Sequence, residues 1–305
     1  MSPGRVSVVW KMVVLILAGQ NHSVTPTARK NRKHLGDAMP NTWLGLEGKV
    51  VIVTGGASGI GRNISRELAR VGAKVAVGDV SVETGIDPET GIFNVKCDIT
   101  SAASVSGMVD AVVSEFGHLD ALVNNAGINL PRMLVDAKQE RPDYELSEHD
   151  FDLMFGVNVK GAFLSAQAAT KALLKNGGGT IVNITSEAGM EGSTGQSCYS
   201  ATKSALNGFT RSWAKELGAQ NIRVVGVAPG INEPTGLTSP LYNDALAYTR
   251  GIKPEQLSTD YSKVIPLGRP GKLSDIANLV VYLVSDRASY ITGTTVNISG
   301  GKSRG

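Results

Sequence analysis

The chain has 305 residues, of which 42% are hydrophobic and 36 are glycine, so it can bury a sizeable core and form many tight turns. Its net charge of +3 is uneven: residues 1–38 hold six basic side chains and one acidic, which is +5 and leaves −2 for residues 39–305. This balance gives no electrostatic reason to expect a nucleic acid as partner. The two cysteines are far apart and no His/Cys cluster has metal-ligand spacing, so we expect neither a disulfide framework nor a metal site.

The first 38 residues differ in composition from the rest of the chain. Residues 6–18 are apolar apart from Ser7 and Lys11, and residues 21–33 are polar and basic. The apolar run is short for a membrane span, and Lys11 interrupts it as the core of a secretory signal. Two interpretations remain. One is a signal or anchor, and the other, which we prefer, is a disordered extension or misplaced start ahead of a single domain over residues 39–305.

Strands and helices alternate in the expected secondary structure from residue 48 onward. The expected strands are short, largely apolar runs, and they cover residues 49–53, 74–79, 93–98, 120–124, 180–184, 222–227 and 294–298. Apolar residues at helical spacing indicate helices over residues 60–71, 104–116, 151–175, 199–218 and 273–284, with a short one over 243–250. This alternation predicts an α/β fold of the Rossmann type, a doubly wound parallel sheet of about seven strands with helices on both faces. The irregular residues 231–270 follow a strand end, where we expect a substrate lid.

A glycine-rich turn follows the first expected strand. The sequence Thr54-Gly55-Gly56-Ala57-Ser58-Gly59-Ile60-Gly61 leaves the strand and opens a helix, where glycines let the backbone approach a pyrophosphate. Asp79 closes the next strand, in the expected place for a carboxylate on the adenosine ribose hydroxyls. Because Asp79 would repel a 2′-phosphate and Ser58 is not basic, the sequence favours NAD over NADP.

Two further strand ends carry polar residues. Asp98 closes the third strand, where its carboxylate is placed either to accept the adenine amino hydrogen bond or to cap the helix that starts near Ser101. The segment Asn124-Asn125-Ala126-Gly127 leaves another strand where the backbone must pass a bound cofactor. Its small residues fit that need, and its asparagines can pin neighbouring strands.

Tyr199 and Lys203 lie four residues apart, on one face of an expected helix. A phenol has a reference pKa of about 10, and a nearby ammonium lowers it. The pair is therefore a candidate acid/base couple. An isolated match of this kind is more often an ordinary amphipathic face, so the interpretation depends on the other motifs.

Together these motifs resemble the short-chain dehydrogenase/reductase family, from residue 39 to the end of the chain. Besides the segments above, the resemblance rests on Asn158 in Asn158-Val159-Lys160-Gly161, Ser186 after a strand, Tyr199-x-x-x-Lys203 and Pro229-Gly230. It implies cofactor contacts from Gly55, Ser58, Gly59, Ile60, Gly61, Asp79, Asp98, Ile99, Asn125, Ala126, Gly127, Tyr199, Lys203, Pro229, Gly230 and Ile231.

The resemblance also implies the catalytic roles. Tyr199 would be the general acid/base, and Lys203 would lower its pKa and bind the nicotinamide ribose. Ser186 would hydrogen-bond the substrate oxygen, and Asn158 would hold a water on a proton path to Lys203. One departure concerns a threonine that the family often places five residues after the proline of Pro-Gly, because Thr235 lies one position further on.

Within the family, the chain more closely resembles the bacterial sorbitol-6-phosphate 2-dehydrogenases. The similar segments are 41–44, 129–136, 187–199 and 300–305. This resemblance implies oxidation of D-sorbitol 6-phosphate to D-fructose 6-phosphate with NAD, in the cytoplasm, by a homotetramer. The alternatives are the same chemistry on another polyol, sugar or 3-oxoacyl substrate, and a non-catalytic, cofactor-sensing protein.

A phosphorylated polyol needs a cation for its phosphate and polar groups for its hydroxyls. Arg132 follows a strand end and is a candidate for a forked phosphate contact, with a solvated surface arginine as the alternative. Other candidate cations are Lys138, Arg141, Lys302 and Arg304. The candidates for the substrate hydroxyls, in addition to Ser186 and Tyr199, are Glu187, Glu191 and Gln196.

Overall fold

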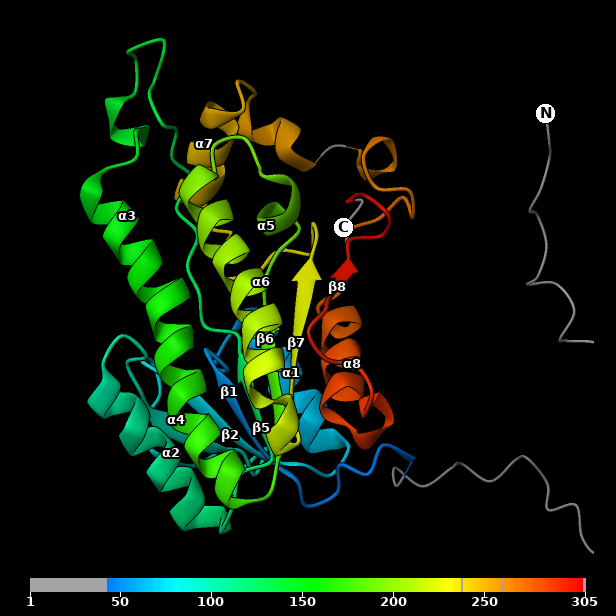
Figure 1. The fold of residues 1–305 in the computed structure, drawn as a ribbon. Helices are drawn as coiled ribbons and strands as arrows, with labels where there is room; N and C mark the ends of the chain where they lie inside the picture. Colours follow the sequence, from blue (N-terminus) through cyan, green and yellow to red (C-terminus); the bar gives the residue numbers. More distant parts are fainter. Residues whose placement is uncertain (1–42, 237, 259, 304–305) are drawn as a thin grey trace, which may run out of the picture. The chain divides into compact units, whose positions relative to one another are not determined.

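The computed structural model describes residues 43–236, 238–258 and 260–303. The predictions for residues 1–38 and for Arg304 lie outside the described residues and stay predictions. Figure 1 shows a central sheet between two layers of helices, with the strands pointing toward the end at which α5 and α7 lie. The predicted α/β architecture is confirmed.

The sheet has eight strands in the order β3-β4-β2-β1-β5-β6-β7-β8, and all neighbours are parallel except β3 and β4. Its strands are β1 Val50–Thr54, β2 Lys74–Asp79, β3 Gly85–Ile86, β4 Phe93–Lys96, β5 Ala121–Asn124, β6 Gly179–Ile184, β7 Ile222–Pro229 and β8 Thr295–Ile298. The seven predicted strands are present. The sequence missed the antiparallel edge strand β3, because two residues carry no periodic signal.

The helices are α1 Gly59–Arg70, α2 Ala102–Phe116, α3 Glu148–Phe155, α4 Ala162–Lys175, α5 Ala188–Glu191, α6 Ser197–Leu217, α7 Pro240–Thr249 and α8 Leu273–Val284. Side chains alternate along β1, so that Val51 and Val53 pack with α1 and α8, whereas Val50 and Ile52 pack with α2, α4 and α6. Each such fully buried aliphatic side chain contributes about 1.5–3 kcal/mol to folding. The predicted helices on both faces are confirmed, and the one-turn helix α5 was missed because of its length.

The predicted single helix over residues 151–175 is wrong in its middle. The segment Gly156–Gly161 is π-helical and separates α3 from α4. Asn158 lies in this segment, and its amide exchanges hydrogen bonds with the backbone of Ile128 at 2.8 and 2.9 Å. The extra residue of a π turn shifts a side chain out of helical register, and such turns are frequent at functional sites.

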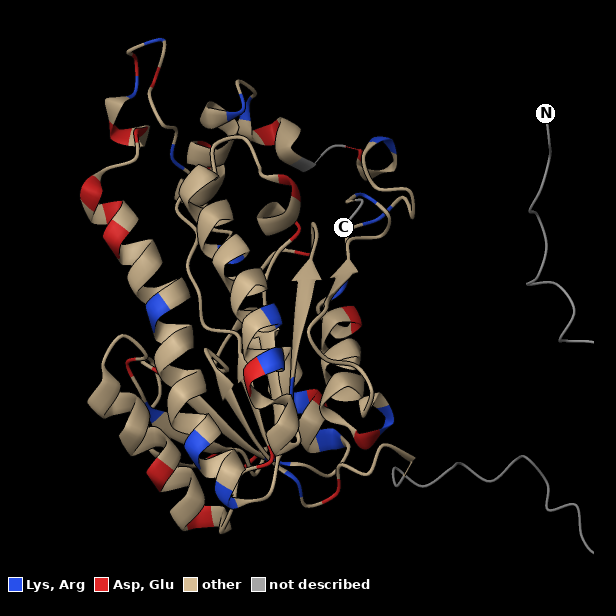
Figure 2. Ribbon diagram, in the orientation of Figure 1, with Lys and Arg blue, Asp and Glu red and all other residues tan. Residues whose placement is uncertain are grey.

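Charged side chains lie mainly on the helices and loops. Figure 2 shows acidic and basic residues interspersed over the helices, while the strands of the sheet are almost uncharged. This distribution fits strands that are covered on both faces. No helix of the described residues is long and apolar enough to cross a membrane.

Candidate active site

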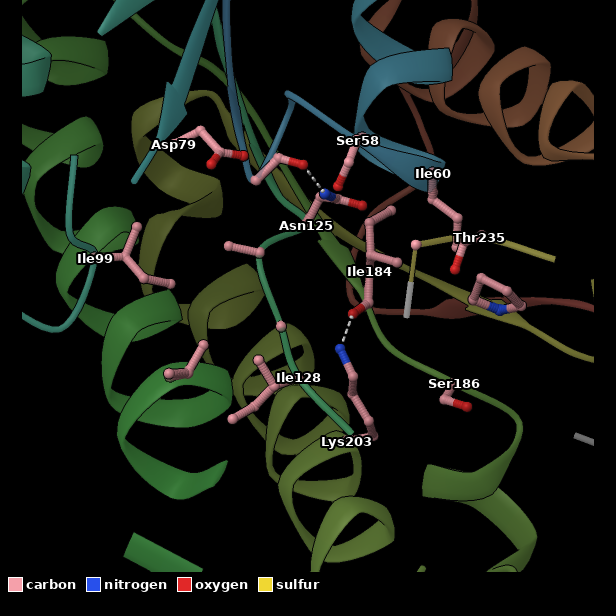
Figure 3. A pocket seen from close by; sticks show the side chains of 18 of the residues that line it. Ser58, Ile60, Asp79, Ile99, Asn125, Ile128, Ile184, Ser186, Lys203 and Thr235 are labelled. Atoms are coloured by element: carbon pink, nitrogen blue, oxygen red, sulfur yellow. Dashed lines mark hydrogen bonds between the residues drawn. The ribbon is translucent and has the colours of Figure 1, made fainter. Parts of the chain in front are cut away.

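A cleft of about 390 Å³ opens at the carboxyl ends of β1, β2, β5, β6 and β7, where ligands of open parallel sheets bind. All the residues predicted to contact the cofactor line it, except Ile231. Figure 3 shows Asp79, Ser58 and Asn125 toward one end and Lys203 and Ser186 toward the other. The fold therefore brings the predicted cofactor motif together with Ser186, Tyr199 and Lys203 in one cavity.

The glycine turn that follows β1 has no room for a side chain at Gly61. A Cβ on Gly61 would lie 2.2 Å from the Gly55 carbonyl oxygen and 2.4 Å from Asn125 Nδ2. Gly55 itself has a φ of +63°, which disfavours residues with a Cβ. Asn125 donates from Nδ2 to the carbonyls of Thr54 and Gly55, at 2.9 and 3.0 Å, which confirms that it pins neighbouring strand ends.

The N-terminus of α1 fits an anionic group. Its N-cap residue is Ser58, whose side chain makes no capping hydrogen bond, so the first backbone N–H groups of the helix have no side-chain acceptor. These groups face a cleft lined by Gly59 and Ile60. Free N–H groups and the helix dipole together attract phosphate.

The acidic residues at the ends of β2 and after β4 are both oriented by local hydrogen bonds. Asp79 accepts from the Ala57 N–H at 3.2 Å and from the N–H and hydroxyl of Ser81 at 3.0 and 2.8 Å. Asp98 accepts from the N–H and hydroxyl of Thr100 at 2.9 and 2.7 Å, and these bonds hold the pKa of its carboxyl below the ordinary value. The capping alternative for Asp98 is wrong, because Ser101 caps α2.

Lys203 is buried, with 4% of its surface exposed, and its Nζ donates to the Ile184 carbonyl at 2.8 Å (Figure 3). Burial penalises the ammonium and lowers the pKa of Lys203 to about 8. The Nζ atom lies 5.7 Å from the ring centroid of Tyr199. One turn of α6 therefore places the amine beside the phenol, as the spacing predicts.

The pKa of Tyr199 is governed mainly by burial of its phenol. Burial raises the pKa of Tyr199 to about 12, although a hydrogen bond with Ser186 acts in the opposite direction. The negative potential of Glu187 raises it further. The Lys203 amine is itself buried and donates to the Ile184 carbonyl.

Asn158 does not line the cleft but lies directly behind it. Its Nδ2 also donates to the Thr202 hydroxyl at 3.0 Å, so the amide is tied both to the turn after β5 and to α6. A Cβ on Gly127 would lie 3.2 Å from Asn158 Oδ1 and 3.5 Å from Lys203 Nζ. Asn158 Oδ1 and Lys203 Nζ thus approach the same residue, Gly127, whose lack of a side chain leaves room for both.

The three residues predicted only for the substrate lie outside the lining of the cleft, and each has a partner. Arg132 donates from Nε to Asp150 at 2.6 Å. Glu187 accepts from Lys302 Nζ at 2.7 Å. Gln196 donates from Nε2 to the Tyr242 hydroxyl at 3.1 Å.

The structure places Thr235 in the cleft and adds lining residues that the sequence did not single out. Thr235 lines the cleft, and a Cβ on Gly59 would lie 3.4 Å from its Cβ, so this threonine reaches the turn despite its shifted position. Other added lining residues are Val80, Thr100, Ile128, Val157, Thr185, Asn232 and Gly236. In the described part of the chain, no group of three His, Cys, Asp or Glu residues could hold a metal ion.

This fold and cleft define a dinucleotide-dependent oxidoreductase. The family model described as short chain dehydrogenase matches residues 49–245. The chain belongs to this family, and the resemblance seen in the sequence is confirmed.

Individual relatives are similar in sequence over most of this chain. A sorbitol-6-phosphate 2-dehydrogenase of Klebsiella pneumoniae is 53% identical over 266 residues, which cover 87% of this chain and 100% of that protein. A 3-oxoacyl-[acyl-carrier-protein] reductase of Thermotoga maritima is 38% identical, covering 84% and 98%. A crystal structure of a Brucella melitensis 3-ketoacyl-(acyl-carrier-protein) reductase complexed with NADH superposes with a TM-score of 0.70 at 32% identity, covering 85% and 99%.

Proposed function

We propose that this protein oxidises D-sorbitol 6-phosphate to D-fructose 6-phosphate with NAD. The observation that carries the proposal is the 53% identity to the Klebsiella dehydrogenase along that protein's whole length. The 38% identity to the Thermotoga reductase is lower, and it supports only the chemistry that the whole family shares. We extend the proposal to the cytoplasm and to a homotetramer on the family resemblance.

The residues of the cleft fit NAD, which supplies the hydride acceptor when bound. The unfilled N–H groups of α1 would hold its pyrophosphate, and Asp79 would accept from the adenosine ribose hydroxyls. A carboxylate in this place disfavours a 2′-phosphate by charge repulsion and thereby selects NAD over NADP. Asp98 and Ile99 line the cleft near the same end and would face the adenine.

The catalytic work of the chain is proton transfer and charge stabilisation. Ser186 and Tyr199 both line the cleft and would hold the substrate oxygen between them. In its phenolate form, which the Lys203 ammonium would stabilise, Tyr199 would take the hydroxyl proton and become a phenol. Lys203 would also bind the nicotinamide ribose. Asn158, which ties the turn after β5 to α6, would keep Lys203 in place and hold a water on the proton path.

Arg132 and Lys302 are two of the candidate cations for the substrate phosphate. Arg132 is paired with Asp150, and Lys302 is paired with Glu187 next to Ser186. We test them by comparing Arg132→Ala with Lys302→Ala on D-sorbitol 6-phosphate and on D-sorbitol. The phosphate ligand is the residue whose loss raises KM about tenfold or more for the phosphorylated substrate alone. An equal effect on both substrates would make that residue structural.

The substrate itself is tested by turnover. Purified protein should form NADH from D-sorbitol 6-phosphate, and a 3-oxoacyl thioester with NADH or NADPH should react poorly. Preferred turnover of the thioester would replace this proposal with the activity of the 38% identical reductases. Binding of NADH without turnover of any polyol or keto substrate would support a cofactor-sensing protein instead.

A further inference from the structure

The hydroxyl of Tyr242, on α7, is a meeting point of three segments of the chain. Its Oη accepts hydrogen bonds from Asn129 Nδ2 at 3.2 Å and from Gln196 Nε2 at 3.1 Å. Asn129 follows the turn after β5 that lines the cleft. Gln196 is the N-cap residue of α6, three residues ahead of Tyr199. The cluster therefore links α7 to the segment after β5 and to the start of α6.

The hydrogen bonds of this cluster leave one donor and one acceptor unused. A phenol has one proton to donate, and both amides already donate into the Tyr242 oxygen. No acceptor for that proton occurs among residues 43–236, 238–258 and 260–303. The Oδ1 atom of Asn129 is buried and has no partner there either. Because buried polar groups are normally hydrogen-bonded, the pair indicates a ligand with a group that both accepts and donates, such as a hydroxyl.

The cluster lies at the start of α6, the helix that carries Tyr199, although none of Tyr242, Asn129 and Gln196 lines the cleft itself. Tyr242 is close enough to Tyr199 to raise its pKa electrostatically, and Gln196 is buried with 7% of its surface exposed. When a substrate oxygen is held by Tyr199 and Ser186, the atoms that come next to it are those on the neighbouring carbons. In a polyol or ketose these carbons carry hydroxyls, whereas in a 3-oxoacyl chain they do not.

We propose that Tyr242 and Asn129 form a recognition subsite for a hydroxyl next to the reacting carbon. Tyr242 Oη donates to the substrate hydroxyl, Asn129 Oδ1 accepts from it, and Gln196 positions Tyr242. The subsite rests on the proposed function and extends it, because it selects hydroxylated substrates over acyl chains of the same length. A site built to bond a hydroxyl discriminates strongly against an analogue that lacks it.

The test uses the conservative variant Tyr242→Phe and the reduction of D-fructose 6-phosphate by NADH. The analogues 1-deoxy- and 3-deoxy-D-fructose 6-phosphate remove one neighbouring hydroxyl each. Tyr248→Phe is the matched control. It removes a hydroxyl that lies on the same helix, away from the cleft, and donates to Asp136 at 2.9 Å. Thermal unfolding and NADH binding of each variant show whether its fold and cofactor site are intact.

Tyr242→Phe should lower kcat/KM for D-fructose 6-phosphate by about tenfold or more, and this loss should disappear with one of the two deoxy analogues. Tyr248→Phe should not distinguish the three substrates. An unchanged Tyr242→Phe enzyme would overturn the subsite. A loss of equal size on all three substrates would do the same, since it would show that the phenol proton is used within the protein. Wild-type protein without turnover of D-fructose 6-phosphate would overturn the proposed function, and the subsite with it.

Discussion

Replacing Lys203 with methionine should change how the stability of the protein depends on pH. Methionine keeps the length and fills the buried site without a charge. In the wild-type protein burial lowers the pKa of Lys203 from 10.5 to about 8. Between these two values the unfolded chain binds more protons than the folded one, so the free energy of unfolding rises with pH.

The magnitude follows from the two pKa values. The full difference between 10.5 and about 8 corresponds to about 3 kcal/mol, and about 2.5 kcal/mol of it is recovered between pH 7 and pH 10. Lys203→Met removes this gain. It also leaves the Ile184 carbonyl without its donor, but that cost is the same at every pH and does not alter the slope.

The assay is urea unfolding of the cofactor-free protein at several pH values between 7 and 10. The wild type should gain about 2.5 kcal/mol relative to Lys203→Met over this interval. Lys215→Met, an exposed position on the same helix, should run parallel to the wild type. A constant difference between wild type and Lys203→Met would refute the reasoning, because the amine would then keep its ordinary pKa in the folded protein.

Three further substitutions test the site. Tyr199→Phe should lower turnover by about 10²- to 10⁴-fold with NADH binding retained, and a rate within tenfold of wild type would remove Tyr199 as the acid/base. Asp79→Asn should raise kcat/KM for NADP relative to NAD by about tenfold or more, whereas an unchanged ratio would mean that this carboxylate does not select the cofactor. Gly61→Ala should cost about 1–3 kcal/mol of stability because its Cβ would lie 2.2 Å from a carbonyl oxygen. The control Gly107→Ala, with open space around its Cβ, should gain about 0.5–1 kcal/mol, and equal effects of the two in urea unfolding would contradict the packing argument.

The sequence carried most of the fold because its strands are strongly patterned. β1, for example, is a run of β-branched residues that ends in glycines, and all five of its residues are buried. The π-helical segment around Asn158 escaped prediction, since one extra residue in a turn barely disturbs apolar spacing. Two-residue and four-residue elements such as β3 and α5 escaped it because they are shorter than any periodic signal.

The cofactor end of the site was predictable for the same local reasons. The glycine turn and Asp79 lie within one βαβ unit, so their spacing along the chain reports their proximity in space. Tyr242, on α7, and its partner Asn129 lie 113 residues apart, and only the folded structure brings them together. The raised pKa of Tyr199 was also beyond sequence reasoning, because it comes from burial of the phenol in the folded protein.

The most direct test of the central claim measures NADH formation by the full chain with D-sorbitol 6-phosphate and with D-sorbitol, each with NAD and with NADP. We predict turnover with the phosphorylated polyol and NAD. Replacing D-sorbitol 6-phosphate by D-sorbitol, or NAD by NADP, should lower kcat/KM at least tenfold. Equal turnover of free sorbitol would contradict the phosphate site, and preference for NADP would contradict the role of Asp79. Absence of turnover with both polyols would contradict the proposed reaction itself.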